Sequence, residues 1–308
     1  MLTIYTWPKS FEDPHIALIQ RNAVRSWLRL EPKPTIFALG EDPGVAGYCA
    51  EFGLTHLPNT GDNRIEVIDG TVRLRDMAAR VEALSNTPFF CYINADIILT
   101  GSIMRAIQVV SARFGRFLLG ASPWELDVNG ELAFEPGWDQ VLEQRARAAD
   151  CPRRPDSADF FLYPRGFLAR APEVLIGRWY VDSGVLWYTR SIGAALVDGT
   201  SGIFTVHQNH HYNHLGGNAF EPGKSVGAQW NLRAIGGFKH FYGWYYATHS
   251  YSAAGLRTYW PGRALHWFGA NPAGNSGGRL LSTWFWNPLR RITGPLRRAL
   301  GVTNPRHS

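Results

Sequence analysis

The chain has 308 residues, of which 45% are hydrophobic and 18% are charged. This composition supports a sizeable buried core and excludes a disordered or fibrous protein. The length fits one large domain with an extension, or two small domains. No run of 18 apolar residues occurs, so a membrane-spanning helix is not expected.

The net charge of +6 is distributed very unevenly along the chain. The first 221 residues hold 20 basic and 25 acidic residues, whereas residues 222–308 hold 11 basic and no acidic ones. This asymmetry predicts a basic extension that meets an anionic surface. Nucleic acid is not the expected partner, because no zinc-finger spacing, RNA-binding signature or helix-turn-helix pattern accompanies the charge.

Cysteine usage and the first residues point to a cytoplasmic protein. Three scattered cysteines are too few for a disulfide framework and favour a reducing compartment. The chain opens on Met-Leu-Thr-Ile-Tyr-Thr, without the basic and apolar regions of a signal peptide.

The first forty residues predict a strand, a helix and a second strand. Leu2–Thr6 is short, β-branched and aromatic, which is typical of a buried strand. Residues 12–30 carry apolar side chains at helical spacing, and Pro32 must end that helix. Thr35–Leu39 predicts the next strand. A β-α-β unit of this kind predicts parallel strands in a layered α/β fold.

The same alternation continues downstream. The polar stretch 122–158, with its Pro and Gly residues, predicts a long insertion over a cleft. Further helices are predicted at 45–52, 73–84, 102–114, 140–149 and after Asp182, and further strands at 89–93, 117–121, 160–163, 194–197 and 203–206.

Asn94-Ala95-Asp96 follows the predicted strand 89–93. A short carboxylate at a strand end projects into the crevice where open α/β sheets bind ligands. Such an oxygen, together with phosphate oxygens and water, is what a hard divalent ion takes. The competing interpretation is that Asp96 caps the next helix.

Four histidines, His207, His210, His211 and His214, follow the last predicted strand. On a helix they would share one face and could hold a transition metal. If His207 instead ends a strand, it points into the crevice alone. A surface loop of merely polar histidines is the third interpretation, and a dedicated zinc site would require a carboxylate or cysteine nearby at fixed spacing.

Asp182 stands just before a predicted helix. It is a candidate N-cap, and it is equally well placed as a general base if it faces the same cleft.

Several longer runs, taken together, resemble bacterial glycosyltransferases of the GT-A (nucleotide-diphospho-sugar transferase) fold, and more narrowly a poorly characterised glycosyltransferase-like group. The resemblance covers about residues 2–220 and predicts a GT-A domain over 1–221. The runs that carry it are Ile-Tyr-Thr at 4–6 with Pro-Lys at 8–9, and those at 22–27, 92–100, 159–166 and 206–210.

This resemblance implies a metal site and a base. Asn94 and Asp96 take the place of the D-x-D motif that binds Mn²⁺ or Mg²⁺ on the sugar nucleotide, although Asn94 offers an amide in place of a carboxylate. A histidine after the later strands often completes the metal shell, and His207, then His210, match it best. Asp182 matches the base of inverting members.

The resemblance also implies a nucleotide site and an acceptor. Glu41 and Asp42 stand where the nucleobase and ribose are held, and Thr6 and Lys9 follow the first strand beside the nucleotide. The expected reaction moves a sugar from a nucleotide-diphospho-sugar to a hydroxyl of a glycan or lipid-linked acceptor. The alternatives are a non-catalytic sugar-nucleotide or glycan-binding protein of the same fold, and a metal hydrolase built on the histidines.

The basic extension, residues 222–308, predicts contact with the inner face of the cell membrane. Two Leu-Arg-Arg segments follow Trp284-Phe285-Trp286, and aromatic and basic side chains of this kind lie in a lipid interface. Pro288 and Pro295 interrupt any long helix, so packing on the domain, disorder or an acidic partner protein stay open.

Overall fold

The computed structural model describes residues 1–61, 64–149, 157–210 and 225–263. The chain divides into one compact unit over Met1–Tyr259 and a second over Trp260–Ser308. Every helix and strand described below belongs to the first unit. Among the described helices, none is long and apolar enough to cross a membrane.

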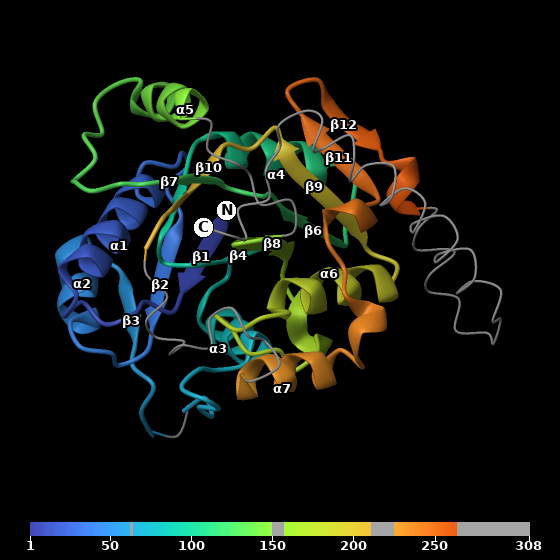
Figure 1. Ribbon diagram of the computed structural model, residues 1–308, viewed down its shortest axis with the longest axis horizontal. Helices are drawn as coiled ribbons and strands as arrows, with labels where there is room; N and C mark the ends of the chain where they lie inside the picture. Colours follow the sequence, from blue (N-terminus) through green and yellow to red (C-terminus); the bar gives the residue numbers. More distant parts are fainter. Residues whose placement is uncertain (62–63, 150–156, 211–224, 264–308) are drawn as a thin grey trace, which may run out of the picture. The chain divides into compact units, whose positions relative to one another are not determined.

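A nine-stranded sheet forms the centre of the first unit, in the order β12-β11-β9-β6-β8-β4-β1-β2-β3 (Figure 1). Neighbouring strands are parallel except at β8, which is antiparallel to β4 and β6, and at β12, which is antiparallel to β11. The predicted α/β class with a mostly parallel sheet is thereby confirmed. The strands are β1 (Leu2–Thr6), β2 (Thr35–Leu39), β3 (Thr55–Leu57), β4 (Phe89–Ile93), β6 (Phe117–Gly120), β8 (Phe160–Pro164), β9 (Ala195–Ser201), β11 (His249–Ser252) and β12 (Gly255–Thr258).

Helices cover both faces of this sheet, as its apolar strands require. Along β4, Cys91 and Ile93 join the core on one face, while Phe90 and Tyr92 join the core on the other. The first face is covered by α1 (Pro14–Trp27), α2 (Val45–Phe52) and α4 (Ser102–Ser111), and the second by α3 (Leu74–Leu84), α6 (Val181–Ser191) and α7 (Val226–Ala234).

A second, three-stranded sheet has the order β5-β10-β7 and comprises β5 (Ile97–Leu99), β10 (Thr205–Gln208) and β7 (Trp124–Leu126). It packs with α5 (Trp138–Ala148) around Ile98, Leu142 and Val206. Both α5 and β7 lie in the stretch 122–158, so that stretch contributes a small core of its own as well as loops. Strand β10 begins two residues later than the sequence predicts, because its pairing with β5 and β7 sets its ends.

Residues 225–259, which the sequence analysis assigned to a separate extension, continue the first compact unit. Strand β11 pairs in parallel with β9, and Trp244 and Tyr251 are buried in the two cores. Apolar burial of this kind ties the segment to the domain that precedes it. Residues 264–308, which include both Leu-Arg-Arg segments, lie outside the described residues.

Candidate active site

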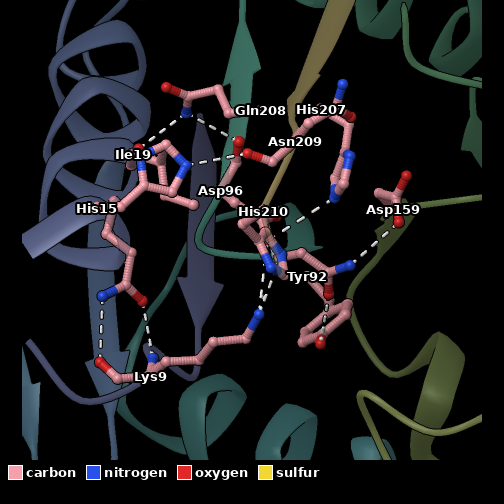
Figure 2. A network of polar contacts seen from close by, with 12 residues as sticks. Lys9, His15, Ile19, Tyr92, Asp96, Asp159, His207, Gln208, Asn209 and His210 are labelled. Carbon is pink, nitrogen blue, oxygen red and sulfur yellow. Dashed lines mark hydrogen bonds and ion pairs between the residues drawn. The ribbon is translucent and has the colours of Figure 1, made fainter. Parts of the chain in front are cut away.

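One acidic and two histidine side chains meet at the edge of the sheet where β4 ends (Figure 2). Asp96 sits in the turn between β4 and β5, His207 lies in β10, and His210 follows β10. Their ligand atoms all lie within 4.8 Å of one another. Asp96 Oδ2 is 2.9 Å from His210 Nε2 and 3.9 Å from His207 Nε2. The structure thus brings together all three residues that the sequence analysis assigned to a metal.

Gln208 holds this arrangement in place from the interior. Its amide Nε2 donates to the backbone oxygens of Ile19 and Asp96, at 2.8 and 2.9 Å. Its Oε1 accepts from Asn22 Nδ2 at 3.2 Å. Because Gln208 is fully buried, these bonds fix β10 against α1 and against the turn that carries Asp96. The histidines on either side of Gln208 are therefore positioned by a rigid segment.

The cluster is electrostatically arranged around a single ionised carboxylate. Burial alone would raise the pKa of Asp96, but the hydrogen bond from His210 and the electrostatic interactions with His207 and Lys9 outweigh it and lower the pKa to well below its usual range. Asp96 Oδ1 and His207 Nδ1 are both buried and find no hydrogen-bond partner among the described residues. A buried carboxylate with one oxygen left over, beside two imidazoles, forms a donor set that suits a divalent cation.

Lys9 contributes a cation to the same place. Its backbone N–H donates to Gln20 Oε1 at 2.7 Å, and Gln20 Nε2 donates back to the Lys9 carbonyl at 3.1 Å. Its Nζ lies 3.1 Å from His210 Nε2 and 3.9 Å from Asp96 Oδ2 (Figure 2). Burial lowers the pKa of Lys9, and the charge of Asp96 opposes that shift only in part. The two hydrogen bonds to Gln20 thus fix the Lys9 backbone, and its side chain extends into the cluster.

Asn94, which the sequence analysis placed on the cofactor, is hydrogen-bonded within the protein. Its Oδ1 accepts from the Tyr92 hydroxyl at 2.9 Å, and its Nδ2 donates to Asp159 Oδ1 at 3.1 Å (Figure 2). An aspartate at position 94 could not make the second bond. The amide therefore presents a carboxylate, Asp159, that the sequence analysis did not assign to the site.

Asp159 reaches the site because β8 runs against the parallel strands. The residue before an antiparallel strand lies at the same edge as the residue after a parallel one, and the backbone N–H of Asn94 donates to the Asp159 carbonyl at 3.0 Å. The one signal in the sequence is an acid directly before a predicted strand.

Asp182 lies in the first turn of α6, where the sequence analysis expected it just before the helix. Its Oδ2 accepts from the backbone N–H of Ala158 at 3.3 Å, which places it beside Asp159. Burial raises the pKa of the Tyr92 hydroxyl, and the charges of Asp182, then of Asp96 and Asp159, raise it further. The charges of three carboxylates thus all act on this one tyrosine hydroxyl.

The remaining predicted nucleotide contacts lie after β1 and β2. Thr6 is buried at the end of β1, and its hydroxyl has no hydrogen-bond partner in the described part of the chain. Trp7 Nε1 donates to Asp42 Oδ2 at 3.3 Å, and Glu41 is exposed beside it. This edge of the sheet is the one that carries Asp96, since β1 and β4 are parallel. His211 and His214 lie outside the described residues.

Comparison with known proteins gives distant structural similarity only. No family model matches the chain, and no curated protein matches it. The solved structure of glucosyl-3-phosphoglycerate synthase from Mycobacterium tuberculosis, with Mn²⁺, uridine diphosphate and phosphoglyceric acid, is 14% identical at a TM-score of 0.47. That similarity covers 77% of this chain and 79% of the other.

Two more solved structures show how distant these similarities are. A mycobacterial protein is 10% identical at a TM-score of 0.47, over 78% of this chain and 74% of the other. Staphylococcus aureus TarS, solved with UDP-GlcNAc, is 8% identical at a TM-score of 0.31, over 44% and 38%. The α/β assignment therefore rests on the sheet of this chain itself.

Proposed function

We propose that the chain is a GT-A type glycosyltransferase that moves a sugar from a nucleotide-diphospho-sugar to a hydroxyl acceptor. The observation that carries this proposal is the cluster of Asp96, His207 and His210, which shares one sheet edge with Asp159 and Asp182. Ligands of open α/β sheets bind at this edge. The reaction needs a stabilised leaving diphosphate and a base, and both can be assigned here.

Asp96, His207 and His210 would hold the divalent cation. Asp96 Oδ1 is buried and lacks a hydrogen-bond partner among the described residues, and one ligand atom from each of the three residues lies within 4.8 Å of the others, which fits that role. A mixed carboxylate and imidazole set suits Mn²⁺ better than Mg²⁺, whose protein ligands are nearly all oxygens. Bound there, such an ion neutralises charge on the leaving diphosphate.

Lys9 and Asp182 would act on the two ends of the transfer. The Lys9 ammonium, held in the cluster by its Gln20 clamp, would donate to a diphosphate oxygen as negative charge develops there. Asp182 would accept the proton of the acceptor hydroxyl while that oxygen bonds to the anomeric carbon and the bond from this carbon to the diphosphate breaks. A direct displacement of this kind inverts the anomeric configuration.

The test is a thermal-shift screen of the full chain with UDP, GDP, ADP, CDP and dTDP, with and without Mn²⁺ or Mg²⁺. We expect one nucleotide to stabilise the protein only when the cation is present. Asp96→Asn keeps the shape of the side chain but removes its charge, so this cation-dependent stabilisation should disappear. If the variant is stabilised as much as the parent, the nucleotide site lies elsewhere.

Turnover separates a transferase from a binding protein of the same fold. The stabilising nucleotide, supplied as its sugar conjugate, should be consumed by the parent and release free nucleoside diphosphate. Binding without any release, across a panel of sugars and acceptors, would favour the non-catalytic alternative. Cation binding that survives Asp96→Asn but is lost on replacing His211 and His214 would favour the metal hydrolase.

Membrane contact through the basic extension is part of this proposal, and a lipid-linked acceptor would then lie close to the enzyme. Each basic residue beside an anionic leaflet contributes about 1 kcal/mol, and the two Leu-Arg-Arg segments together hold four arginines. The full chain should co-sediment with phosphatidylglycerol vesicles, and a chain ending at Arg263 should not. Equal sedimentation of the two chains would reject the membrane contact.

A further inference from the structure

Exposed aromatic side chains gather around Tyr180, two residues before Asp182. Trp179, Phe238 and Phe241 are 43%, 66% and 38% exposed. Tyr180 lies between them, with its ring centroid 5.7 Å from that of Phe238, 6.0 Å from Phe241 and 6.5 Å from Trp179. We call these four side chains the aromatic platform. Contiguous exposed apolar surface of this kind is typical of a binding site.

The platform spans two segments that pack together at α6. Trp179 and Tyr180 lead into α6, and Phe238 and Phe241 belong to the segment after α7, which Figure 1 shows in orange passing alongside α6. The strands that flank α6 in sequence place its N-terminus at the sheet edge that carries the cluster of Asp96. The segment that carries Trp179 and Tyr180 therefore enters α6 at the sheet edge of the proposed site of transfer.

The loop that carries Trp179 and Tyr180 is fixed by buried polar contacts. Asn231 of α7 donates to the carbonyl oxygens of Leu175 and Trp179, both at 3.0 Å. Its Oδ1 accepts from the Leu175 N–H at 2.6 Å. Asn231 is fully buried, so one side chain holds both ends of this loop.

Tyr180 itself stands in a strained conformation. Its φ of 74° lies in the left-handed region, which costs a bulky residue on the order of 1–3 kcal/mol. Such strain persists only where the surroundings over-determine it, and it clusters at ligand-binding sites. The Asn231 contacts supply that constraint here. The fold thus fixes the backbone from which this ring projects before any ligand arrives.

The chemistry of the platform favours a sugar ring. All four side chains are aromatic, and none is aliphatic. The face of an aromatic ring is electrically negative, so it attracts the weakly positive C–H groups that line one face of a pyranose. An acyl chain has no such preference and packs equally well on leucine.

We propose that the aromatic platform is the acceptor subsite and stacks against a pyranose ring whose hydroxyl is presented to Asp182. This inference rests on the proposed glycosyltransferase function. It names the acceptor as a glycan or glycoside, and it assigns specificity to four residues that no catalytic step uses.

The experiment measures binding of methyl glycosides of glucose, galactose, mannose and rhamnose to the full chain by saturation-transfer NMR. Phe238→Leu keeps an apolar side chain but removes the aromatic face, and Phe238→Trp keeps the face. We expect one glycoside to bind the parent and Phe238→Trp alike, and to bind Phe238→Leu about three- to tenfold more weakly. Phe134→Leu, a matched change beside Trp138 and away from α6, should leave glycoside binding unchanged.

Two outcomes would overturn the inference: no glycoside binds the parent, or Phe238→Leu binds the glycoside as tightly as the parent does. A surface that binds phosphatidylcholine vesicles equally well with Phe or Leu at position 238, and no glycoside, would be a lipid contact. Nucleotide binding with Mn²⁺ is measured on the same variants and should not change. If the parent binds no nucleotide, the proposed function is overturned. The glycoside measurement would still show whether the aromatic platform binds a sugar ring.

Discussion

At the scale of single residues, Asp96 and Asp182 differ in their surroundings and in the roles proposed for them. Asp96 is buried among three positively charged or titratable neighbours, whereas Asp182 contacts the backbone at Ala158. Neutralising Asp96 should therefore abolish cation binding, whereas neutralising Asp182 should abolish proton transfer.

Asp182→Asn retains the size of the side chain and its place in the first turn of α6. Loss of a general base reduces turnover by about 10²- to 10⁴-fold, so kcat of sugar transfer should fall by that amount. Nucleotide and cation binding should survive, because neither is assigned to this residue. Equal transfer rates in parent and variant, measured by release of nucleoside diphosphate, would remove Asp182 from the mechanism.

Asn94→Asp tests the role of the amide. The change restores the first acid of a D-x-D motif, so an enzyme limited by cation binding would gain activity. The structure predicts the opposite, because the new carboxylate would face Asp159 in place of the present 3.1 Å hydrogen bond. We expect a loss of about 1–3 kcal/mol in the free energy of unfolding, together with weaker transfer. Denaturant unfolding and transfer assays would measure both, and a gain in either would contradict the assignment.

Only part of this site follows from the sequence. Asp96 and His207 are found because each ends or follows an apolar run that predicts a strand. Asp159 is missed because its place depends on β8 being antiparallel, and nothing in a five-residue apolar segment states the direction of its pairing. The hydrogen bonds of Asn94 cannot be predicted from the sequence either, because the fold around a side chain determines its partners.

At the scale of elements, length decides what the sequence predicts. Strands β1, β2 and β4 and helix α2 have the predicted bounds, because each is a distinct run with clear breakers on both sides. Strands β3, β5 and β7 have three residues each and were not predicted. Three residues are too few to show a hydrophobic periodicity. These strands form because their backbones hydrogen-bond to a neighbouring strand.

Two helical glycines offer a matched test of packing. A Cβ on Gly184 of α6 would lie 2.8 Å from Val174 Cγ1 and 2.9 Å from Ile235 Cγ2, whereas a Cβ on Gly47 of α2 would meet nothing within 4 Å. Gly184→Ala should therefore destabilise the protein by about 1–3 kcal/mol through overpacking. Gly47→Ala should stabilise it by about 0.5–1 kcal/mol, because alanine favours the helix. Chemical denaturation of both variants measures the change in the free energy of unfolding. A change of the same sign in both variants would contradict this account of the packing of α6.

At the scale of the whole chain, the sheet extends beyond the change in charge at residue 221. A chain ending there lacks α7, β11 and β12 and leaves the long edge of β9 unpaired. We expect it to lose cooperative unfolding, since the Trp244 and Tyr251 packing and the Asn231 clamp are gone. A chain ending at Arg263 should unfold cooperatively within a few degrees of the full protein. Calorimetry of the two would decide where the first domain ends.

The position of β11 also has a consequence for synthesis of the protein on the ribosome. Every residue assigned to the cation or to proton transfer lies at or before His210, but β9 finds its outer neighbour only when residues 249–252 emerge. A nascent chain therefore already contains every residue of its reactive edge while the far side of the sheet still displays an open strand. Such an edge invites pairing with other chains, so translation of the last hundred residues is when this protein most needs protection from aggregation.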